Sequence, residues 1–161
     1  MQKNIILLFD SIRDPRDLAE MILLGLALDI KIELTGSSLS QNHIKVLNII
    51  NSWIPGFKEK PILNGVKSFG DFSKRITQLK KLGYTIIGTS PTANKSLFKT
   101  DLSTKKHVIV FGNESSGLSK DKTALMDEMI FVPMKPPVAF FTIRAIAPLI
   151  AYEAMRQKNL L

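Results

Sequence analysis

Residues 107–122, HVIVFGNESSGLSKDK, contain the change from strand to loop to helix on which the fold of this chain depends. The apolar run that ends at Phe111 is typical of a buried strand. Gly112 and Gly117 enclose a polar loop, and Ser119 is a helix-start signal because its hydroxyl can accept a hydrogen bond from a free backbone amide. The stretch therefore predicts a strand, a glycine-bounded loop and a helix, which together can bind an anion or a nucleoside.

The same loop has the spacing of a phosphate-binding loop except at one position. Gly112, Gly117 and Ser119 match G-x-x-x-x-G-K-S, but Leu118 replaces the lysine that contacts the β- and γ-phosphates. Glu114 would also place a carboxylate among the backbone amides that bind phosphate. These differences argue against a nucleotide triphosphatase, and they leave an ordinary tight turn as the alternative to a ligand-binding loop.

The composition indicates one domain over residues 1–161, long enough to bury a core without disulfides. The sequence has no cysteine and only two histidines, His43 and His107, so we expect no metal site. No apolar run approaches the roughly 20 residues of a membrane span, and the first residues do not resemble a signal peptide. We therefore expect a cytoplasmic protein with no membrane partner.

The positive charge is concentrated in the middle of the chain. Residues 58–122 contain 13 Lys and Arg against 5 Asp and Glu, a net charge of +8. This segment therefore accounts for the whole net charge of the chain, which is also +8. Such a basic segment attracts a polyanion, with RNA as the expected partner, and a solvated surface is the alternative. The RNA-contacting candidates on one expected helix in this segment are Lys74, Arg75, Lys80 and Lys81.

Strand and helix patterns alternate along the chain, which predicts an α/β fold with a mostly parallel sheet covered by helices on both faces. We expect strands at 4–9, 30–34, 61–63, 84–88, 107–111 and 129–132. Helices are expected at 14–29, 71–82 and 140–158. A further helix is expected to have Ser40 as its cap and to end at a buried Trp53. Residues 89–106 form a long polar loop, and loops of this length usually serve binding or gating.

Three separated segments of the chain resemble the three motifs of the SpoU (TrmH-like) branch of the SPOUT RNA methyltransferases. DPRDLA at 14–19 is similar to the D-P-x-N-x-G turn, and FGNESSGL at 111–118 is similar to F-G-x-E-x-x-G-L. VPM at 132–134 and YEAMR at 152–156 are similar to the two ends of the long third motif. The segments occur in the family order and span almost the whole chain.

This resemblance implies a C-terminal deep trefoil knot, a homodimer formed through the knot region, and S-adenosylmethionine as the cofactor. It also implies transfer of a methyl group to ribose 2′-hydroxyls of tRNA or rRNA. Carried over by position, the cofactor-binding residues would be Gly88, Thr89, Gly112, Val132, Met134, Phe140 and Phe141.

The chain departs from the family motifs at positions that matter for catalysis. Leu23 stands where active relatives have an arginine, Asp17 replaces the asparagine of the first motif, and Thr142 replaces that of the third. An arginine suits a phosphate because its charge is permanent and its donors are forked. The candidates to replace it are Arg13, Arg16 and Arg144.

The resemblance therefore gives two sets of predicted site residues. Arg144, Glu114 and Arg16 are the predicted catalytic residues, and Arg13 joins the lysine-rich helix as a predicted RNA contact. The alternative for Arg144 is an ion pair with Glu153 or Asp17. The favoured function is an RNA 2′-O-ribose methyltransferase, and the alternative is a catalytically silent dimeric relative that binds RNA or cofactor.

Overall fold

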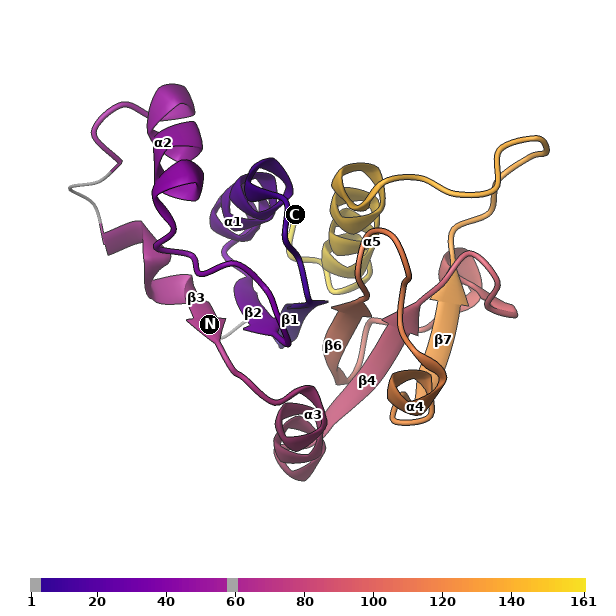
Figure 1. Ribbon diagram of the computed structural model, residues 1–161. Coiled ribbons are helices and arrows are strands. Elements are labelled where there is room, and N and C mark those ends of the chain that lie inside the picture. Colours follow the sequence, from indigo (N-terminus) through magenta and orange to yellow (C-terminus); the bar gives the residue numbers. More distant parts are fainter. Residues whose placement is uncertain (1–3, 58–60) are drawn as a thin grey trace.

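The computed structural model describes residues 4–57 and 61–161, and within them seven parallel strands form one sheet (Figure 1). The order of the strands across the sheet is β3-β2-β1-β6-β4-β7-β5. Every described pairing is parallel, which confirms the predicted sheet. The strands are β1 (Ile5–Asp10), β2 (Lys31–Thr35), β3 (Val66–Ser68), β4 (Tyr84–Thr89), β5 (Lys95–Ser96), β6 (Lys106–Phe111) and β7 (Glu128–Phe131).

Helices cover both faces of the sheet, as the alternation of patterns predicts (Figure 1). One face is covered by α1 (Pro15–Leu28) and α5 (Ile143–Gln157), and α2 (Ile44–Trp53) packs against α1. The other face is covered by α3 (Phe72–Lys81) and by the short α4 (Lys120–Thr123). Two 3-10 helices, η2 (Pro61–Gly65) and η3 (Leu97–Lys99), lie in the connections.

The two central strands are apolar on both faces because both faces are covered. All six residues of β1 are buried, and so are the last five of β6. Phe9 and Phe111 stack with ring centroids 5.0 Å apart, so the ends of the two strands are packed together. These neighbouring ends lie where the chain changes direction across the sheet, the usual position of a binding crevice in an open α/β sheet.

The capping residues explain where most helices begin. Asp14 accepts hydrogen bonds from the amides of Arg16 and Asp17 at the start of α1, and Ser119 accepts one from Lys122 at the start of α4. The prediction for α2 is wrong by three residues, because His43, not Ser40, is its cap and accepts a hydrogen bond from the Lys45 amide.

Three further expectations are corrected by the packing. Trp53 is 41% exposed instead of buried, and the guanidinium of Arg16 lies 6.0 Å from its ring. Residues 61–63 belong to η2, and the strand begins only at Val66. The last helix begins at Ile143 instead of residue 140, so the two phenylalanines before it lie in the preceding loop.

Candidate functional site

Two pockets lie at the carboxyl ends of the central strands, on opposite sides of the loop of residues 113–117. The larger has a volume of about 1460 Å³ and the smaller about 800 Å³. All five loop residues line both pockets, so the loop is a shared wall. A ligand in one pocket is therefore separated from a ligand in the other by a single strand-to-helix turn.

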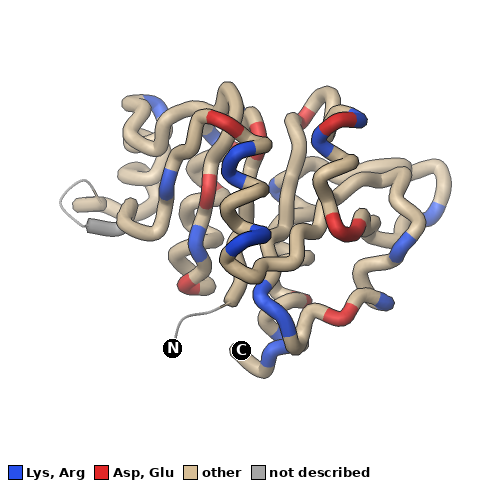
Figure 2. The backbone as a smooth tube through the Cα atoms, turned by 90° about the horizontal axis from the view of Figure 1, so that it is seen from below, with Lys and Arg blue, Asp and Glu red and all other residues tan. Residues whose placement is uncertain are grey.

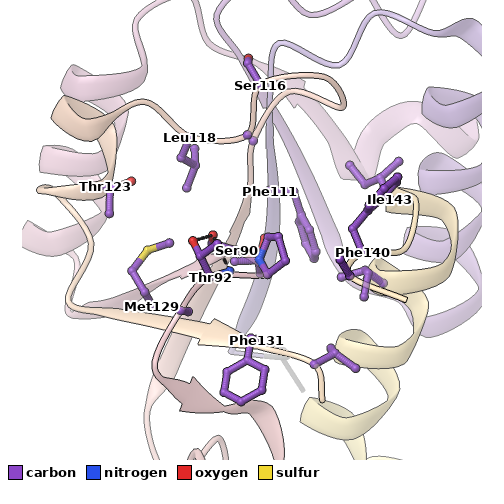
Figure 3. Close-up of a pocket in the computed structure, with 18 of the residues that line it drawn as sticks. Ser90, Thr92, Phe111, Ser116, Leu118, Thr123, Met129, Phe131, Phe140 and Ile143 are labelled. Atoms are coloured by element: carbon purple, nitrogen blue, oxygen red, sulfur yellow. Dashed lines mark hydrogen bonds between the residues drawn. The ribbon is translucent and has the colours of Figure 1, made fainter. Parts of the chain in front are cut away.

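The larger pocket, which we call the apolar pocket, is lined mainly by apolar side chains from β6, β7, α5 and the loops that adjoin them (Figure 3). Phe111 reaches it from the end of β6, and Ile143 and Phe140 face it from the start of α5 and the loop before it. The others of this set are Leu118, Met129, Phe131, Val132, Met134, Val138 and Ile146.

A second wall of the apolar pocket comes from residues 89–95, the first part of the predicted long loop. The Ser90 amide donates to the carbonyl oxygen of Ile130 at 3.0 Å, and Thr89 Oγ1 donates to the Val110 carbonyl at 3.1 Å. Lys95 Nζ lies 2.7 Å from Glu128 Oε2. This part of the loop is therefore attached to strands β6 and β7, and its role in binding stays a prediction.

Asn113 fixes the shape of the shared loop. Its Nδ2 donates to the carbonyl oxygen of Ser11 at 2.9 Å, and its Oδ1 accepts from the Ser115 amide at 3.0 Å. At the base of the loop, a Cβ on Gly112 would collide with the backbone of Gly117 and Leu118. The loop is thus tied to the end of β1 and closes tightly only because residue 112 has no side chain.

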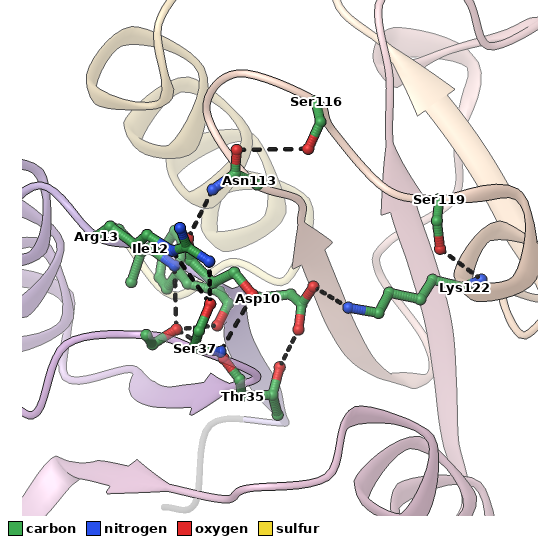
Figure 4. Close-up of polar contacts among 12 residues, drawn as sticks. Asp10, Ile12, Arg13, Thr35, Ser37, Asn113, Ser116, Ser119 and Lys122 are labelled. Atoms are coloured by element: carbon green, nitrogen blue, oxygen red, sulfur yellow. Dashed lines mark hydrogen bonds and ion pairs between the residues drawn. The ribbon is translucent and has the colours of Figure 1, made fainter.

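The smaller pocket, which we call the polar pocket, is charged. Asp10 is 3% exposed, and its carboxylate pairs with Lys122 Nζ at 2.5 Å and accepts from Thr35 Oγ1 at 3.0 Å (Figure 4). Asp14 is occupied as the cap of α1. A buried carboxylate is energetically unfavourable unless it is paired with a positive charge. Lys122 supplies that charge for Asp10, so it belongs to the floor of this pocket and is not a free surface cation.

Two side chains of the polar pocket remain available to a ligand. Among the residues that the structure describes, the guanidinium of Arg13 donates only to the Ser37 hydroxyl, from Nη2 at 2.6 Å and from Nε at 3.1 Å. Glu114 lines both pockets, and its only described hydrogen bond is a long one of 3.3 Å from Asn113. The pocket therefore offers one arginine and one carboxylate beside the shared loop.

Asp17 also lines the polar pocket, and it links this pocket to α5 through an ion pair with Arg144. Its Oδ1 lies 2.9 Å from Arg144 Nε. Burial raises the pKa of the Asp17 carboxyl, and the neighbouring Asp14 raises it further, whereas Arg144 lowers it. Arg144 is also 3.6 Å from Glu20, so its guanidinium joins α5 to α1.

The sequence matches the SpoU rRNA Methylase family over residues 4–141. The chain belongs to this family. It is 29% identical over 109 residues to the tRNA (guanosine(18)-2′-O)-methyltransferase of Escherichia coli K12, which covers 68% of this chain and 43% of that protein. A protein of the same name from Thermus thermophilus is 31% identical over 88 residues, which covers 55% and 45%. The chain thus covers less than half the length of either curated relative.

The same fold is found in solved SpoU-type structures. The AdoMet-bound rRNA methyltransferase from Sinorhizobium meliloti superposes with a TM-score of 0.84 at 18% identity, over 100% of this chain and 58% of that one. This likeness concerns the fold alone. The family match confirms the resemblance to SpoU proteins. Its range includes the first two motifs and VPM at 132–134, whereas YEAMR at 152–156 lies beyond it.

The predicted cofactor-binding residues of this SpoU-family chain fall into three groups. Five of them line the apolar pocket, namely Thr89, Gly112, Val132, Met134 and Phe140. Phe141, which is 50% exposed, lines a small adjoining cavity of about 80 Å³ with Phe140. Gly88 lies behind the wall, where its missing Cβ leaves room for Met126 and Met129.

The predicted catalytic residues are not brought together. Glu114 is in the site, but neither Arg144 nor Arg16 lines either pocket. Arg144 forms the ion pair with Asp17 that we considered as its alternative role, and Arg16 lies 3.6 Å from Glu20. The geometry therefore gives both arginines a place in the packing of α1 and leaves their catalytic roles unsupported.

The predicted RNA contacts also divide. Arg13 lines the polar pocket, and Lys74 and Lys81 are exposed on α3. Arg75 is different, because its guanidinium lies 2.7 Å and 2.5 Å from the buried Glu33 carboxylate and packs over Phe69. Lys80 pairs with Asp127 at 2.8 Å. Arg75 therefore joins α3 to β2 instead of facing solvent.

Several residues of the site were missed by the sequence analysis. Asp10 and Lys122 form the floor of the polar pocket, and Phe111 and Met129 line the apolar one. A polar residue directly after the apolar run of the expected strand 4–9 was the available signal for Asp10, which is the last residue of β1. In the part of the chain that the structure describes, no group of His, Cys, Asp and Glu could hold a metal ion, and no helix could span a membrane.

Proposed function

We propose that this SpoU-family protein transfers a methyl group from S-adenosylmethionine to a ribose 2′-hydroxyl of tRNA or rRNA. The observation that carries the proposal is the pair of pockets that share the loop of residues 113–117. The names of the relatives from Escherichia coli and Thermus thermophilus, both tRNA 2′-O-methyltransferases, support the reaction class. The AdoMet-bound neighbour from Sinorhizobium meliloti supports the choice of cofactor.

The apolar pocket suits S-adenosylmethionine in size and chemistry. Its volume of about 1460 Å³ exceeds what one small ligand needs, and Met129, Val132 and Ile146 provide apolar contacts for an aromatic base. Glu114 also lines it, and its carboxylate would favour a nearby positive charge, whereas Glu128 is paired with Lys95. When bound, the cofactor supplies an electrophilic methyl group on a positively charged sulfur.

The polar pocket would receive the nucleotide. Arg13 is available for a phosphate oxygen because its guanidinium is engaged only with a hydroxyl. Glu114 lines both pockets, so it would be placed to orient the 2′-hydroxyl and to accept its proton. The oxygen would gain the methyl group as the sulfur–carbon bond of the cofactor breaks, and the demethylated cofactor would be the leaving group. Holding the two reactants on either side of one fixed loop is the main contribution we assign to the protein.

We further propose the homodimer and the knot that the family resemblance implies. Apolar side chains are exposed around α5, which is consistent with a partner on this face: Val138, Phe140, Phe141, Leu149 and Tyr152. The trefoil knot, a single methyltransferase domain over residues 1–161, and a location in the cytoplasm stay predictions. Light scattering of the purified protein at micromolar concentration tests the dimer.

One observation favours the second candidate, a silent relative that binds RNA or cofactor. Leu23 packs against the core, and Arg144, which we considered as a substitute for the family arginine, is paired with two carboxylates. Among the described residues, Arg13 is then the one arginine that lines either of the two pockets and could bind a phosphate. A silent protein would bind the cofactor without transferring the methyl group.

Methyl transfer from isotope-labelled S-adenosylmethionine to unmodified tRNA and rRNA transcripts tests the proposal. We expect label in RNA, and a dinucleotide at the labelled site that resists alkaline hydrolysis because its 2′-hydroxyl is methylated. Label on a base instead of the ribose would overturn the reaction class. Cofactor binding with no label in any RNA would favour the silent relative.

A further inference from the structure

Four lysines gather at the amino-terminal edge of the sheet, opposite the two pockets; we call them the amino-edge cluster: Lys81, Lys105, Lys106 and Lys158. Lys106 is the first residue of β6 and pairs in register with Tyr84, the first residue of β4. Lys81 is the last residue of α3, three positions before that strand. Seen from below, Lys and Arg positions follow one another along the underside towards the end marked C (Figure 2).

Hydrogen bonds bring the end of the chain into the same cluster. Lys158 Nζ donates to the carbonyl oxygens of Lys105 at 2.6 Å and Ser103 at 3.2 Å. Lys106 Nζ lies 5.6 Å from the Tyr84 ring. The lysine at position 158 is thus fixed beside the start of β6, whereas the side chains of Lys105 and Lys106 are exposed.

The cluster is not neutralised within the protein. Among the residues that the structure describes, none of its four lysines forms an ion pair. The carboxylates that act electrostatically on this edge are Asp101, Asp127 and Glu128, and Glu128 pairs with Lys95. Asp101 is already hydrogen-bonded to Ser103, and Asp127 pairs with Lys80. The edge therefore carries an excess of positive charge that an external anion can balance.

Neighbouring groups respond to this charge. The pKa of His107 is lowered to about 4, first by burial and then by Lys158. Burial lowers the pKa of Lys158, and Asp101 raises it. A local excess of positive charge raises the concentration of anions near the surface and steers a polyanion towards it.

The position of the cluster defines the size of the anion. It lies at one end of β6 and the pockets lie at the other, and a six-residue strand spans roughly 17 Å to 20 Å. The exposed Lys74 and Lys81, which are seven residues apart on α3, lie on one face of that helix and continue the positive charge between the two edges. A single nucleotide cannot contact both edges, but a folded RNA can.

We propose that the amino-edge cluster binds backbone phosphates of a structured RNA whose target nucleotide occupies the polar pocket at the opposite edge. The inference rests on the proposed function for the identity of the anion. The cluster selects for RNA size and shape, because phosphate contacts position an RNA without reading its sequence. A full-length tRNA should therefore bind more tightly than a short single strand that contains the same target.

The test is the double variant Lys105→Gln/Lys106→Gln, with Lys45→Gln/Lys67→Gln as the matched control. Both pairs are exposed and have no described ion pair, and both variants lose two positive charges. Lys158 is left unchanged because it holds two backbone carbonyls, and Lys80 and Arg75 because they are paired. The probe is an unmodified full-length tRNA transcript, titrated between about 50 mM and 200 mM salt.

We expect the cluster variant to lose at least about tenfold in tRNA affinity at low salt, and its log–log salt slope to fall by up to about two units. The control variant should keep the slope of the wild type, and both variants should bind S-adenosylmethionine normally. Equal slopes for all three proteins, or no tRNA binding by the wild type, would overturn the proposal.

The methyl-transfer assay separates failure of this surface from failure of the proposed function. If the wild type binds tRNA through the cluster but transfers no methyl group, the surface stands and the enzymatic proposal fails. If methyl transfer occurs with the same KM for tRNA in wild type and cluster variant, the enzyme stands and the surface proposal fails. Binding of an acidic protein in place of RNA would also contradict it.

Discussion

The apolar pocket is lined mainly by apolar side chains of β6, β7, α5 and the loops that adjoin them, whereas the polar pocket across the same loop is lined by six charged residues. In the polar pocket most charges already have partners, such as Lys122 for Asp10 and Arg144 for Asp17. We infer from this difference that the two pockets bind different reactants. Backbone shape and apolar contacts would bind the cofactor in the apolar pocket, and a few free polar groups would bind the nucleotide in the polar pocket. Substitutions on the two sides of the loop should therefore have separable effects.

The largest effect should come from the glycine at the base of the shared wall. In Gly112→Ala the new Cβ would collide with the backbone of Gly117 and Leu118, so the loop must move and both pockets change shape. We expect S-adenosylmethionine affinity to fall by at least about 30-fold and the free energy of unfolding by about 1 to 3 kcal/mol. Calorimetric titration and urea unfolding measure the two changes.

Gly70→Ala is the matched control for this substitution, since a Cβ at that position meets nothing within 4 Å. Its affinity for the cofactor should equal that of the wild type. Unchanged binding by Gly112→Ala would mean that the tight closure of the loop is not needed for the apolar pocket.

Removing a paired charge should destabilise the polar side without altering the apolar side. Lys122→Met leaves the Asp10 carboxylate, which is 3% exposed, with the Thr35 hydroxyl as its described partner. Breaking a fully buried pair costs about 3 to 5 kcal/mol, and we expect nearer 2 kcal/mol because the Lys122 side chain is 32% exposed. Urea unfolding measures the loss.

Lys120→Met provides the control for that experiment, because Lys120 lies in the same short helix, is exposed and has no described ion pair. It should be close to wild type in stability. If the two variants lose the same stability, the Asp10–Lys122 pair contributes nothing specific.

Arg13→Ala should weaken the use of RNA without changing the affinity for the cofactor. The substitution removes the proposed phosphate contact and should lower kcat/KM for RNA by about 10- to 100-fold, the equivalent of a hydrogen bond to a charged group. Cofactor affinity should stay the same, because Arg13 lines only the polar pocket. Lys45→Ala, which removes an exposed charge elsewhere, should change neither value; an equal loss in both variants would refute the assignment.

The smallest effect is a change in pH dependence at Asp17. Because burial raises the pKa of this carboxyl in the folded protein, the folded state binds its proton more tightly than the unfolded chain does. The contribution to stability is therefore lost as pH rises from the ordinary Asp value of 3.8 through the raised pKa. Asp17→Asn cannot ionise, so its stability relative to wild type should increase between pH 4 and pH 7.

Unfolding free energies of the two proteins at several pH values test that sign. A decrease of the variant relative to wild type over the same range would mean that the pair with Arg144 outweighs the cost of burial. In that case Asp17 would act mainly as an anchor for α5.

The sequence predicted the mostly parallel sheet, its two helical faces and the loop between the pockets, but it placed β3 too early and included β5 in a long loop. The central strands β1 and β6 are apolar except at one end of each, and the caps at Asp14 and Ser119 are local signals. The errors concern positions where local rules compete. Ser40 and His43 are both able to cap α2, and the apolar side chain of Trp53 remained partly exposed beside Arg16.

The site was predicted less completely than the fold because it depends on pairing across distant segments. Arg144 is far from Asp17 in the sequence, and only the packing of α5 on α1 makes them partners. Arg75 has the residue type of an RNA contact, but the buried Glu33 on β2 engages it. The motif around Gly112 located the shared wall, and the sequence also named Arg13 and Glu114, whereas the Asp10–Lys122 pair of the polar pocket became apparent only from the structure.

Calorimetric titration of the purified protein with S-adenosylmethionine, and with its demethylated product, is the most direct test of the division between the pockets. The account predicts one site for each chain, bound equally well by the wild type and by Arg13→Ala, and lost in Gly112→Ala. A folded wild-type protein that binds neither compound would contradict the account, because the apolar pocket would then not be a cofactor site.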